Sequence, residues 1–306
     1  MKNSGRNNLQ FFNPEMQEAI LQRTVMENEL HQALASGQFQ LHYQLQLDSA
    51  LRPLGAEGLI RWLHPVRGMV SPARFIPMAE ECGMILAIGR WVIDTACAQI
   101  KAWQQDPITC GLTLAINVSA RQFQQADFVE HVTAAIQRNG IAPSLLKLEL
   151  TESLLQADIE GTIEKMSALK NVGVQFSLDD FGTGYSSLQY IKRLPLDQIK
   201  IDQSFVRDID VDESDKVIVR TIIAMAQSLD MDVIAEGVET EGQRKLLYSL
   251  NCTHYQGYLF SKPLAAESFE RLLRERGYRS VAPVRDVDEQ IMQGSGGFWN
   301  EGLATP

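Results

Sequence analysis

The sequence predicts an α/β fold: a (β/α)8 TIM-type barrel in which one strand runs antiparallel to the others. Strand-like and helical segments alternate along the chain until eight strands are in place. Several of these strands are near-continuous apolar runs, such as LTLAINVS and DVIAEGV. Because such strands are buried on both faces, they indicate a parallel sheet covered by helices, and eight of them indicate a closed barrel.

One connection between the predicted strands differs from the rest. The strands cover residues 38–48, 54–63, 112–119, 145–153, 174–181, 198–205, 232–239 and 253–261. Only about five residues separate the first two strands, which is too few for a parallel crossover. We therefore predict that the first strand is antiparallel to the second.

Helical periodicity fills the segments between the strands. In residues 75–104, apolar side chains recur every three to six positions from Ile76 to Trp103. Further helices are predicted at residues 123–139, 159–171, 215–229 and 240–250. We expect Gly140, Gly173 and Asp230 to end three of these helices.

The two ends of the chain depart from the barrel pattern. Residues 1–12 are polar and have no place in the barrel, which is assigned to residues 37–278. Residues 279–306 include GSGG and are expected to form a loosely ordered tail. Residues 13–36 have the pattern of an amphipathic connecting helix. The apolar side chains available for one side of it are Met16, Ile20, Val25, Leu30 and Leu34.

The composition excludes some classes of function. A net charge of −10 argues against a basic surface for DNA or RNA, but it permits a small anionic ligand, because bound metal ions reverse the local charge. The four cysteines show no CxxC pairing, which favours buried free thiols in a reducing compartment. No apolar run approaches about 18 residues, and no signal peptide is present. We expect a soluble, cytoplasmic domain, although absent segments of a longer parent protein could attach it to a membrane.

Polar side chains recur at matching positions of the predicted strands. Asp179 and Asp180 end an apolar run and precede a glycine-rich turn, and two adjacent acids are costly unless cations neutralise them. The side chains in the same structural position are Glu57, Asn117, Glu149, Lys200, Glu236 and Gln256. Functional residues of such barrels collect at the carboxyl ends of the strands. Oxygen ligands without histidine or cysteine suit two Mg²⁺ or Mn²⁺ ions, an arrangement typical of phosphodiester hydrolysis.

Each side chain of this set has a second interpretation. An acid near the end of a strand is often only a helix cap or a surface residue, and Glu152 in LTES is placed to cap or brace the loop that follows. Asn117 in AINVS is predicted to be a buried amide of its strand, and it is either a ligand or a structural hydrogen-bonding group. Lys200 lies between two isoleucines, and we expect it to point into the barrel because the outer face packs on helices. The five histidines show no metal-binding spacing and are interpreted as structural or exposed.

Six ordered motifs resemble one known family. They are RWLHPVRGMVSPARFIPMAEECGMI, INVSARQF, LELTES, DDFGTGYSSLQYIKRLPLDQIKID, AEGVET and QGYLFSKPL. From about residue 30 to residue 277, the chain resembles the EAL domain of bacterial cyclic di-GMP phosphodiesterases. The resemblance implies a (β/α)8-type barrel with one antiparallel strand. It also implies hydrolysis of one phosphodiester bond of cyclic di-GMP to linear pGpG, with Mg²⁺ or Mn²⁺.

The resemblance also implies metal ligands. Residues of this chain that match ligands of a first ion are Glu57, Asn117, Glu149 and Asp179. Asp179 would bridge to a second ion, which Asp180 and Glu236 would help to hold.

The remaining motif positions imply catalytic and substrate contacts. Lys200 resembles the residue that orients the attacking water and assists its deprotonation, and Glu152 the glutamate that braces the DDFGTGYSS loop. Residues that resemble substrate contacts or the last members of the site are Gln44, Arg61, Glu239 and Gln256. The planar donors of Arg61 suit a phosphate oxygen.

Two positions depart from the family pattern. The signature Glu-Ala-Leu is Glu57-Gly58-Leu59 here, and the usual Tyr-Gln-Pro is Tyr43-Gln44-Leu45. A glycine within a strand costs stability of up to about 1 kcal/mol, and Leu45 restores a backbone N–H that proline lacks. Neither change removes a ligand. The alternative to an enzyme is a catalytically weak or silent EAL domain that serves as a cyclic di-GMP receptor.

The first residues suggest a larger parent protein. KNSGRNNLQFF is similar to the end of a GGDEF domain, so we expect GGDEF-like and sensory domains ahead of this chain. The family often forms homodimers near the DDFGTGYSS loop, and residues 181–188 keep the small residues that a mobile loop needs. We therefore expect a homodimer as well.

Overall fold

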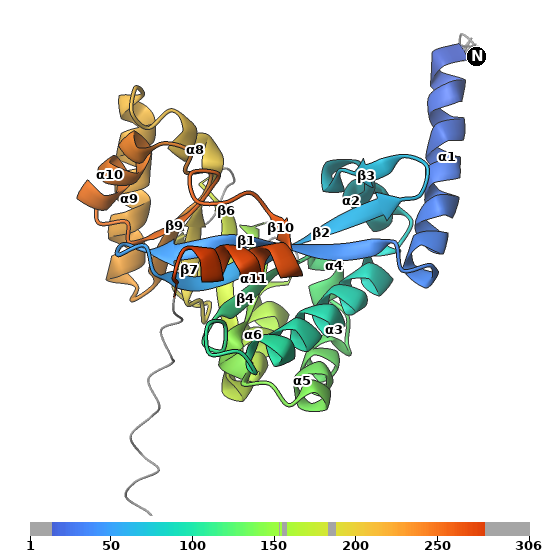
Figure 1. Ribbon diagram of the computed structural model, residues 1–306, viewed down its shortest axis with the longest axis horizontal. Helices are drawn as coiled ribbons and strands as arrows, with labels where there is room; N and C mark the ends of the chain where they lie inside the picture. The colour runs from blue at the N-terminus through green and yellow to red at the C-terminus, as the bar shows by residue number, and fades with distance from the viewer. Residues whose placement is uncertain (1–13, 153, 155–157, 183–187, 279–306) are drawn as a thin grey trace, which may run out of the picture.

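The alternating segments close into a barrel surrounded by helices in the computed structural model (Figure 1). The structure describes residues 14–152, 154, 158–182 and 188–278, with side chains from residue 25 onward. The predicted remnant at residues 1–12, the tail at 279–306 and most of the glycine-rich loop lie outside this part. The predictions made for them therefore stay predictions.

Eight strands form the barrel wall. They are β1 (Phe39–Asp48), β2 (Pro53–His64), β4 (Thr113–Val118), β5 (Leu146–Thr151), β6 (Gln175–Phe181), β7 (Gln198–Ile201), β8 (Asp232–Ala235) and β9 (His254–Gln256). The sequence did not predict two short strands, β3 (Gly68–Val70) and β10 (Leu264–Ala265). They pair antiparallel with β2 and β1, respectively. The predicted (β/α)8 architecture is confirmed.

The first strand closes the barrel in the opposite direction to the others. β1 pairs antiparallel with β2 on one side and with β9 on the other, whereas each pairing from β2 through β4 to β9 is parallel. This confirms the prediction drawn from the short first connection.

Helices surround the barrel, except that α1 projects away from it (Figure 1). They are α1 (Pro14–Ala35), α2 (Pro72–Glu81), α3 (Ile85–Trp103), α4 (Ala120–Phe123), α5 (Phe128–Asn139), α6 (Ile159–Val172), α7 (Leu188–Ile191), α8 (Gln203–Arg207), α9 (Glu213–Ser228), α10 (Glu241–Ser249) and α11 (Ala266–Glu275), with a 3₁₀ turn at Pro143–Leu145. Gly140, Gly173 and Asp230 follow helix ends with positive φ angles of 58°, 107° and 55°. Their predicted role as helix stops is confirmed.

The single helix predicted at residues 75–104 is wrong. The chain forms α2 and α3 instead, and Gly83 between them has a φ angle of 80°. Apolar periodicity continues across such a break, because both helices pack their apolar sides on the same barrel wall. The helix predicted at residues 123–139 is likewise divided into α4 and α5.

Three predicted strands are too long. The strand expected at residues 198–205 ends at Ile201, because the Asp202 side chain accepts a hydrogen bond from the Ser204 N–H and begins α8. The strands expected at residues 232–239 and 253–261 end at Ala235 and Gln256. Each of these strands ends within one residue of a candidate site residue, namely Lys200, Glu236 or Gln256.

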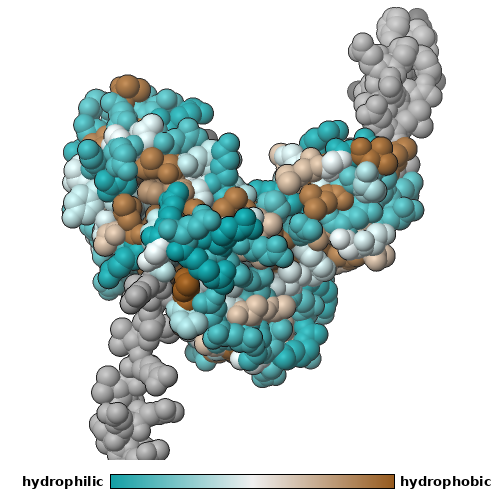
Figure 2. Space-filling model, viewed as in Figure 1, coloured by the Kyte–Doolittle hydropathy of each residue, from teal (hydrophilic) through white to brown (hydrophobic). Residues whose placement is uncertain are grey.

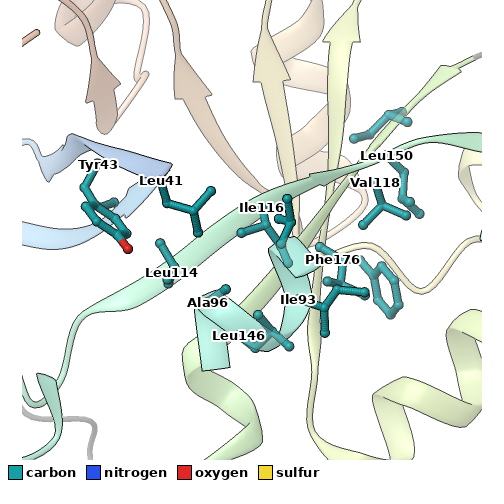
Figure 3. Packing of buried hydrophobic residues seen from close by; sticks show 14 of the residues in the cluster. Leu41, Tyr43, Ile93, Ala96, Leu114, Ile116, Val118, Leu146, Leu150 and Phe176 are labelled. Atoms are coloured by element: carbon teal, nitrogen blue, oxygen red, sulfur yellow. The ribbon is translucent and has the colours of Figure 1, made fainter. Parts of the chain in front are cut away.

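The main core lies between the barrel wall and the helices. Leu114 and Ile116 of β4 and Leu146 of β5 point outward against Ile93 and Ala96 of α3 (Figure 3). These residues are essentially inaccessible to solvent. The surface facing the viewer in Figure 2 is mostly hydrophilic, in keeping with the net charge of −10.

Helix α1 is anchored by its last turns. Met26, Leu30 and Ala33 are buried, whereas Val25, which was predicted on the apolar side, is 48% exposed. The expected apolar side is therefore wrong at this position, since the packing side is set by the 3.6-residue turn through Met26 and Leu30. Residues 16 and 20 lie where no side chain is described.

The cysteine prediction holds in part. All four cysteines are free, and Cys97 and Cys252 are buried, but Cys82 and Cys110 are only half-buried. Among the described helices, none is long and apolar enough to cross a membrane.

Gly58 is expected to tolerate alanine. An added Cβ would lie 3.3 Å from Ile116 Cγ2 and 3.4 Å from Leu114 Cδ1, so these side chains would have to shift by only a few tenths of an ångström. Because alanine loses less chain entropy on folding, Gly58→Ala should stabilise the protein by about 0.4–1 kcal/mol in urea unfolding. Gly55→Ala on the same strand is the matched control, since its Cβ would overlap the Thr113 carbonyl and hydroxyl oxygens. A destabilised Gly58→Ala variant would mean that Ile116 and Leu114 cannot shift.

Candidate active site

The carboxyl ends of the barrel strands bring the predicted side chains together. Glu57, Asn117, Glu149, Asp179 and Lys200 lie on β2, β4, β5, β6 and β7, Asp180 follows Asp179, Glu236 directly follows β8, and Gln256 ends β9. A cavity of about 250 Å³ opens at this point. Its lining includes Glu57, Asp179, Lys200, Glu236 and Gln256. The structure therefore brings these predicted side chains together at one end of the barrel.

Lys200 occupies the centre of the cluster. Its side chain is 1% exposed, which supports the predicted inward orientation. Its ammonium lies 2.7 Å from Glu149 Oε2 and from Glu236 Oε1, 3.1 Å from Asp179 Oδ1 and 3.5 Å from Glu57 Oε2. Burial alone would lower the pKa of Lys200, but these carboxylates raise that pKa well above its ordinary value. Lys200 is therefore a permanent cation in this arrangement.

Glu57 is held by amide groups on both carboxylate oxygens. Asn117 Nδ2 donates to Oε1 at 2.7 Å, and Gln256 Nε2 donates to Oε2 at 2.6 Å. Burial alone would raise the pKa of Glu57, but Lys200 and these donors hold it below its ordinary value. Asn117, predicted to be buried, is exposed at the mouth of the barrel and still makes this contact.

The other acids carry more negative charge than Lys200 can neutralise. Burial and then the charge of Glu57 raise the pKa of Glu149 well above its ordinary value. Burial and then Asp179 raise the pKa of Asp180 to about 6, and the pKa of Glu236 is raised to about 8, chiefly by burial, despite its contact with Lys200. The cluster therefore favours binding of further positive charge.

The arrangement fits a divalent cation. Ligand oxygens of Asp179, Asp180 and Glu236 lie within 4.8 Å of one another, and no other cluster of this kind is found in the described part of the chain. Glu149 Oε1 is buried and, among the described residues, has no hydrogen-bond partner. An all-oxygen donor set with a buried, unpaired carboxylate oxygen suits Mg²⁺ or Mn²⁺.

The two adjacent aspartates face different surroundings. Asp180 has a φ angle of 53°, a left-handed conformation that turns the chain sharply after Asp179. Its N–H donates to Asp179 Oδ1 at 2.9 Å, the same oxygen that faces Lys200. Asp179 is buried, while Asp180 reaches toward solvent. The turn thereby presents two carboxylates to one site from adjacent positions.

Glu152 lies beside this turn. Its Oε1 accepts a hydrogen bond from the Gly182 N–H at 3.2 Å. Gly182 has a φ angle of 100°, and a Cβ there would lie 2.9 Å from the Phe205 ring. This contact favours the bracing role over a helix cap, although residues 183–187 of the loop are outside the described part.

The predicted substrate residues divide between two cavities. Gln44, Glu239 and Gln256 line the charged cavity, with Glu239 exposed at its rim. Arg61 is half-buried and lines a neighbouring, largely apolar cavity of about 350 Å³ instead. Leu59 lines both, so the two cavities meet at the strand that carries Glu57.

Leu45 has a backbone N–H, which a proline at this position would lack, and this group has a partner. Its N–H lies 3.5 Å from Ser261 Oγ, and the neighbouring Gln44 Nε2 donates to the Ser261 carbonyl at 3.3 Å. The departure from the family pattern therefore ties β1 to the segment after β9.

Several residues at the site were not predicted. Asp202 raises the pKa of Asp180, and Gln203 and Tyr258 line the charged cavity. Asp202 was assigned to the interior of a strand, and its acidic side chain after an apolar strand was the signal that could have identified it. Gln46, a buried amide on β1, carried no local signal because its partner is 210 residues away.

A barrel with a ring of carboxylates around one lysine, at the carboxyl ends of its strands, defines a class of barrel proteins suited to holding divalent cations. Comparison with known proteins places the chain more narrowly. It belongs to the EAL domain family, whose model matches residues 27–263.

Two similar curated proteins come from Pseudomonas aeruginosa. The cyclic di-GMP phosphodiesterase NbdA is 42% identical over 294 residues, which are 94% of this chain and 37% of NbdA. The bifunctional diguanylate cyclase/cyclic di-GMP phosphodiesterase MucR is 41% identical over 267 residues, 87% of this chain and 39% of MucR. The chain thus spans about two fifths of the length of these relatives.

Solved structures agree with the family assignment. The PaMucR phosphodiesterase in complex with c-di-GMP is 42% identical, with a TM-score of 0.76 over 79% of this chain and 98% of that one. The EAL enzyme Bd1971, bound to cAMP and cyclic-di-GMP, is 34% identical, with a TM-score of 0.80 over 83% of this chain and 70% of that one.

Proposed function

We propose that this chain hydrolyses one phosphodiester bond of cyclic di-GMP to linear pGpG, using two Mg²⁺ or Mn²⁺ ions, in bacterial second-messenger signalling. The observation that carries the proposal is the cluster of five carboxylates around Lys200 at the barrel mouth. The names of two relatives also support the proposal, because both NbdA and MucR are named as cyclic di-GMP phosphodiesterases.

The chain's own residues would divide the work of holding the ions. Glu57, Asn117, Glu149 and Asp179 would hold one ion, and Asp179, Asp180 and Glu236 the other. When bound, the two ions would lower the pKa of a water molecule and stabilise charge on the attacking and leaving oxygens. Asn117 and Gln256 keep Glu57 ionised and oriented before any ion arrives.

Lys200 would act as a fixed positive charge. Its contacts with four carboxylates keep it protonated, so it positions an attacking water by donating hydrogen bonds. The proton released from that water would pass to a neighbouring carboxylate.

The two cavities would receive different parts of the substrate. The charged cavity would hold the scissile phosphate, with Gln44, Glu239 and Gln256 around it. The apolar cavity includes Ile60, Ile76 and Val92 in its lining and would receive a planar purine base, with Arg61 beside a phosphate oxygen. A dinucleotide that is charged in the middle and aromatic at its ends matches this pattern.

We further propose that residues 37–278 act as the phosphodiesterase module of a longer protein with GGDEF-like and sensory domains. The support is that the chain spans 39% of MucR, which is named for both activities. Homodimer formation near the loop after Phe181 also stays a proposal. Sedimentation of the active protein as a monomer would contradict a need for pairing.

Hydrolysis of cyclic di-GMP, followed by chromatography in Mg²⁺ and in Mn²⁺, tests the main proposal. Conversion to pGpG that is lost in Glu57→Ala would support the enzyme and show that Gly58 and Leu45 are tolerated. Tight binding measured by calorimetry without any turnover would contradict it and favour the receptor.

Glu152→Ala is expected to lower the rate of hydrolysis by about 10–100-fold, because groups that orient metal ligands contribute on this scale. The variant loses the acceptor for the Gly182 N–H and frees the turn that follows Asp180. Glu152→Gln retains an acceptor oxygen and serves as the matched control. Hydrogen exchange should show faster exchange at Gly182 in the alanine variant alone. Equal rates of hydrolysis in the wild type and both variants would contradict the bracing role.

A further inference from the structure

Gln46 is a buried amide directly behind the charged cavity. Its side chain belongs to β1 and the residue is 2% exposed. In the sheet, Gln46 lies opposite Gln256 of β9 on one side and opposite Gly55 of β2 on the other. The Gln46 Nε2 donates to Gln256 Oε1 at 2.9 Å, so its side chain lies against β9.

This hydrogen bond fixes which way the Gln256 amide faces. With Oε1 accepting from Gln46, Gln256 Nε2 points to Glu57 Oε2 at 2.6 Å and to Gln44 Oε1 at 3.2 Å. The reversed amide would place an oxygen against Glu57 and an NH₂ group against the Gln46 NH₂ group. Since an amide oxygen only accepts and its nitrogen only donates, both contacts would then be repulsive.

The orientation of Gln256 in turn determines the position of Glu57. Asn117 holds one oxygen of this carboxylate and Gln256 holds the other. If Gln256 turned, Glu57 would lose a charge-assisted hydrogen bond inside a site where burial makes each such bond strong. The relay runs from Gln46 through Gln256 to Glu57, across three strands of the barrel.

We infer that Gln46 is a positioning residue that acts through Gln256 to hold Glu57 in the orientation needed to bind a divalent cation. The inference rests on the proposed metal site, and it adds a residue that contacts neither the cation nor the substrate. Removal of a group that orients a metal ligand typically weakens metal binding by about 10–100-fold.

Mn²⁺ binding, measured by calorimetry and by electron paramagnetic resonance on the whole chain, tests this role without relying on activity. Gln46→Leu should bind Mn²⁺ about 10–100-fold more weakly than the wild type. The double variant Gln46→Leu/Gln256→Leu should bind no more weakly than Gln256→Leu alone, because Gln46 acts only through Gln256. At saturating Mn²⁺, the KM for cyclic di-GMP should be nearly unchanged.

Two further variants separate positioning from a loss of stability. Gln38→Leu is the matched control: its Oε1 accepts from Trp62 Nε1 at 2.9 Å, far from the cluster, so Mn²⁺ affinity should stay at the wild-type value. Gln46→Glu keeps the size of the side chain but replaces the donor by an acceptor. It should weaken Mn²⁺ binding by about tenfold or more relative to the wild type, so it tests the positioning role even where the leucine variant fails to fold.

The outcomes distinguish the positioning role from the metal site itself. If the wild type binds Mn²⁺ and both folded Gln46 variants bind it equally well, the positioning role is wrong and the metal site stands. Losses that add in the double variant would also overturn it, since Gln46 would then act independently of Gln256. A wild type that binds no Mn²⁺ would overturn the metal site, and the positioning role with it.

Discussion

Replacing Lys200 by alanine is expected to reduce hydrolysis of cyclic di-GMP by about 10²–10³-fold, the range for loss of a preorganised hydrogen-bond donor that stabilises the transition state. The same change should destabilise the metal-free protein by about 3–5 kcal/mol, because it removes the cation that pairs with several buried carboxylates. Lys200 Nζ contacts Glu149 and Glu236 at 2.7 Å each. Without it, these carboxylates must take up protons or lose the compact arrangement.

Thermal unfolding with and without Mn²⁺ separates the two effects. Excess Mn²⁺ should restore much of the lost stability of Lys200→Ala, since an ion can replace the missing positive charge, but it should not restore the rate. Lys216→Ala is the control: its ammonium pairs with Glu213 at 3.0 Å on the surface, and its loss should change neither property. A Lys200→Ala variant with wild-type stability and a rate within tenfold of the wild type would contradict the central role of this lysine.

The affinity for Mg²⁺ is expected to rise by up to about 100-fold between pH 6 and pH 8. In this range the proton and the metal ion compete for Glu236, whose pKa is raised to about 8, so each pH unit should change the affinity by about tenfold. Below pH 6 the dependence should steepen, because Asp180, with its pKa raised to about 6, also becomes protonated. Calorimetric titration with Mg²⁺ at several pH values measures this slope.

The stability of the metal-free protein should change in the opposite direction. A carboxyl group whose pKa is raised on folding stabilises the folded state below its unfolded pKa, and this contribution disappears as the pH rises through the folded pKa. For Glu236 the window runs from its ordinary value of 4.5 up to about 8. Glu236→Gln should flatten both the stability profile and the Mg²⁺ profile in this window. A Mg²⁺ affinity that is constant from pH 6 to pH 8 would contradict the assignment.

Much of the fold was predictable because its determinants are local in the sequence. The short connection before Pro53 sets the direction of β1, and the apolar runs set the parallel strands. The acids and Lys200 could be placed at the mouth because the carboxyl ends of parallel strands must meet there.

The sequence-based predictions that were wrong or missing failed for a different physical reason. Gly83 and Asp202 end elements through a backbone angle and a side-chain cap, which apolar periodicity does not register. The exposure of Asn117 and the separation of Arg61 from the charged cavity depend on how neighbouring strands and helices stack. The Gln46–Gln256 contact joins residues 210 positions apart, so it becomes visible only once the barrel has closed.

The reversed direction of β1 also determines the end of the barrel at which helix α1 is attached. In a barrel with all strands parallel, the first strand would begin at the face opposite the active site. Here Phe39 at the start of β1 pairs with Trp62 near the end of β2, so α1 joins the barrel at the carboxyl ends of the parallel strands.

Helix α1 is also anchored to the chain just after β2. Glu29 on α1 holds Arg67 at 3.1 Å, just beyond the strand that carries Glu57 and Arg61. A helix advances 1.5 Å and turns about 100° per residue. One residue inserted into or deleted from α1 before Glu29 would therefore shift and rotate any domain attached to the N-terminal end of the helix. A push or twist delivered along α1 would thus act directly on the strand that carries Glu57, without having to travel through the barrel.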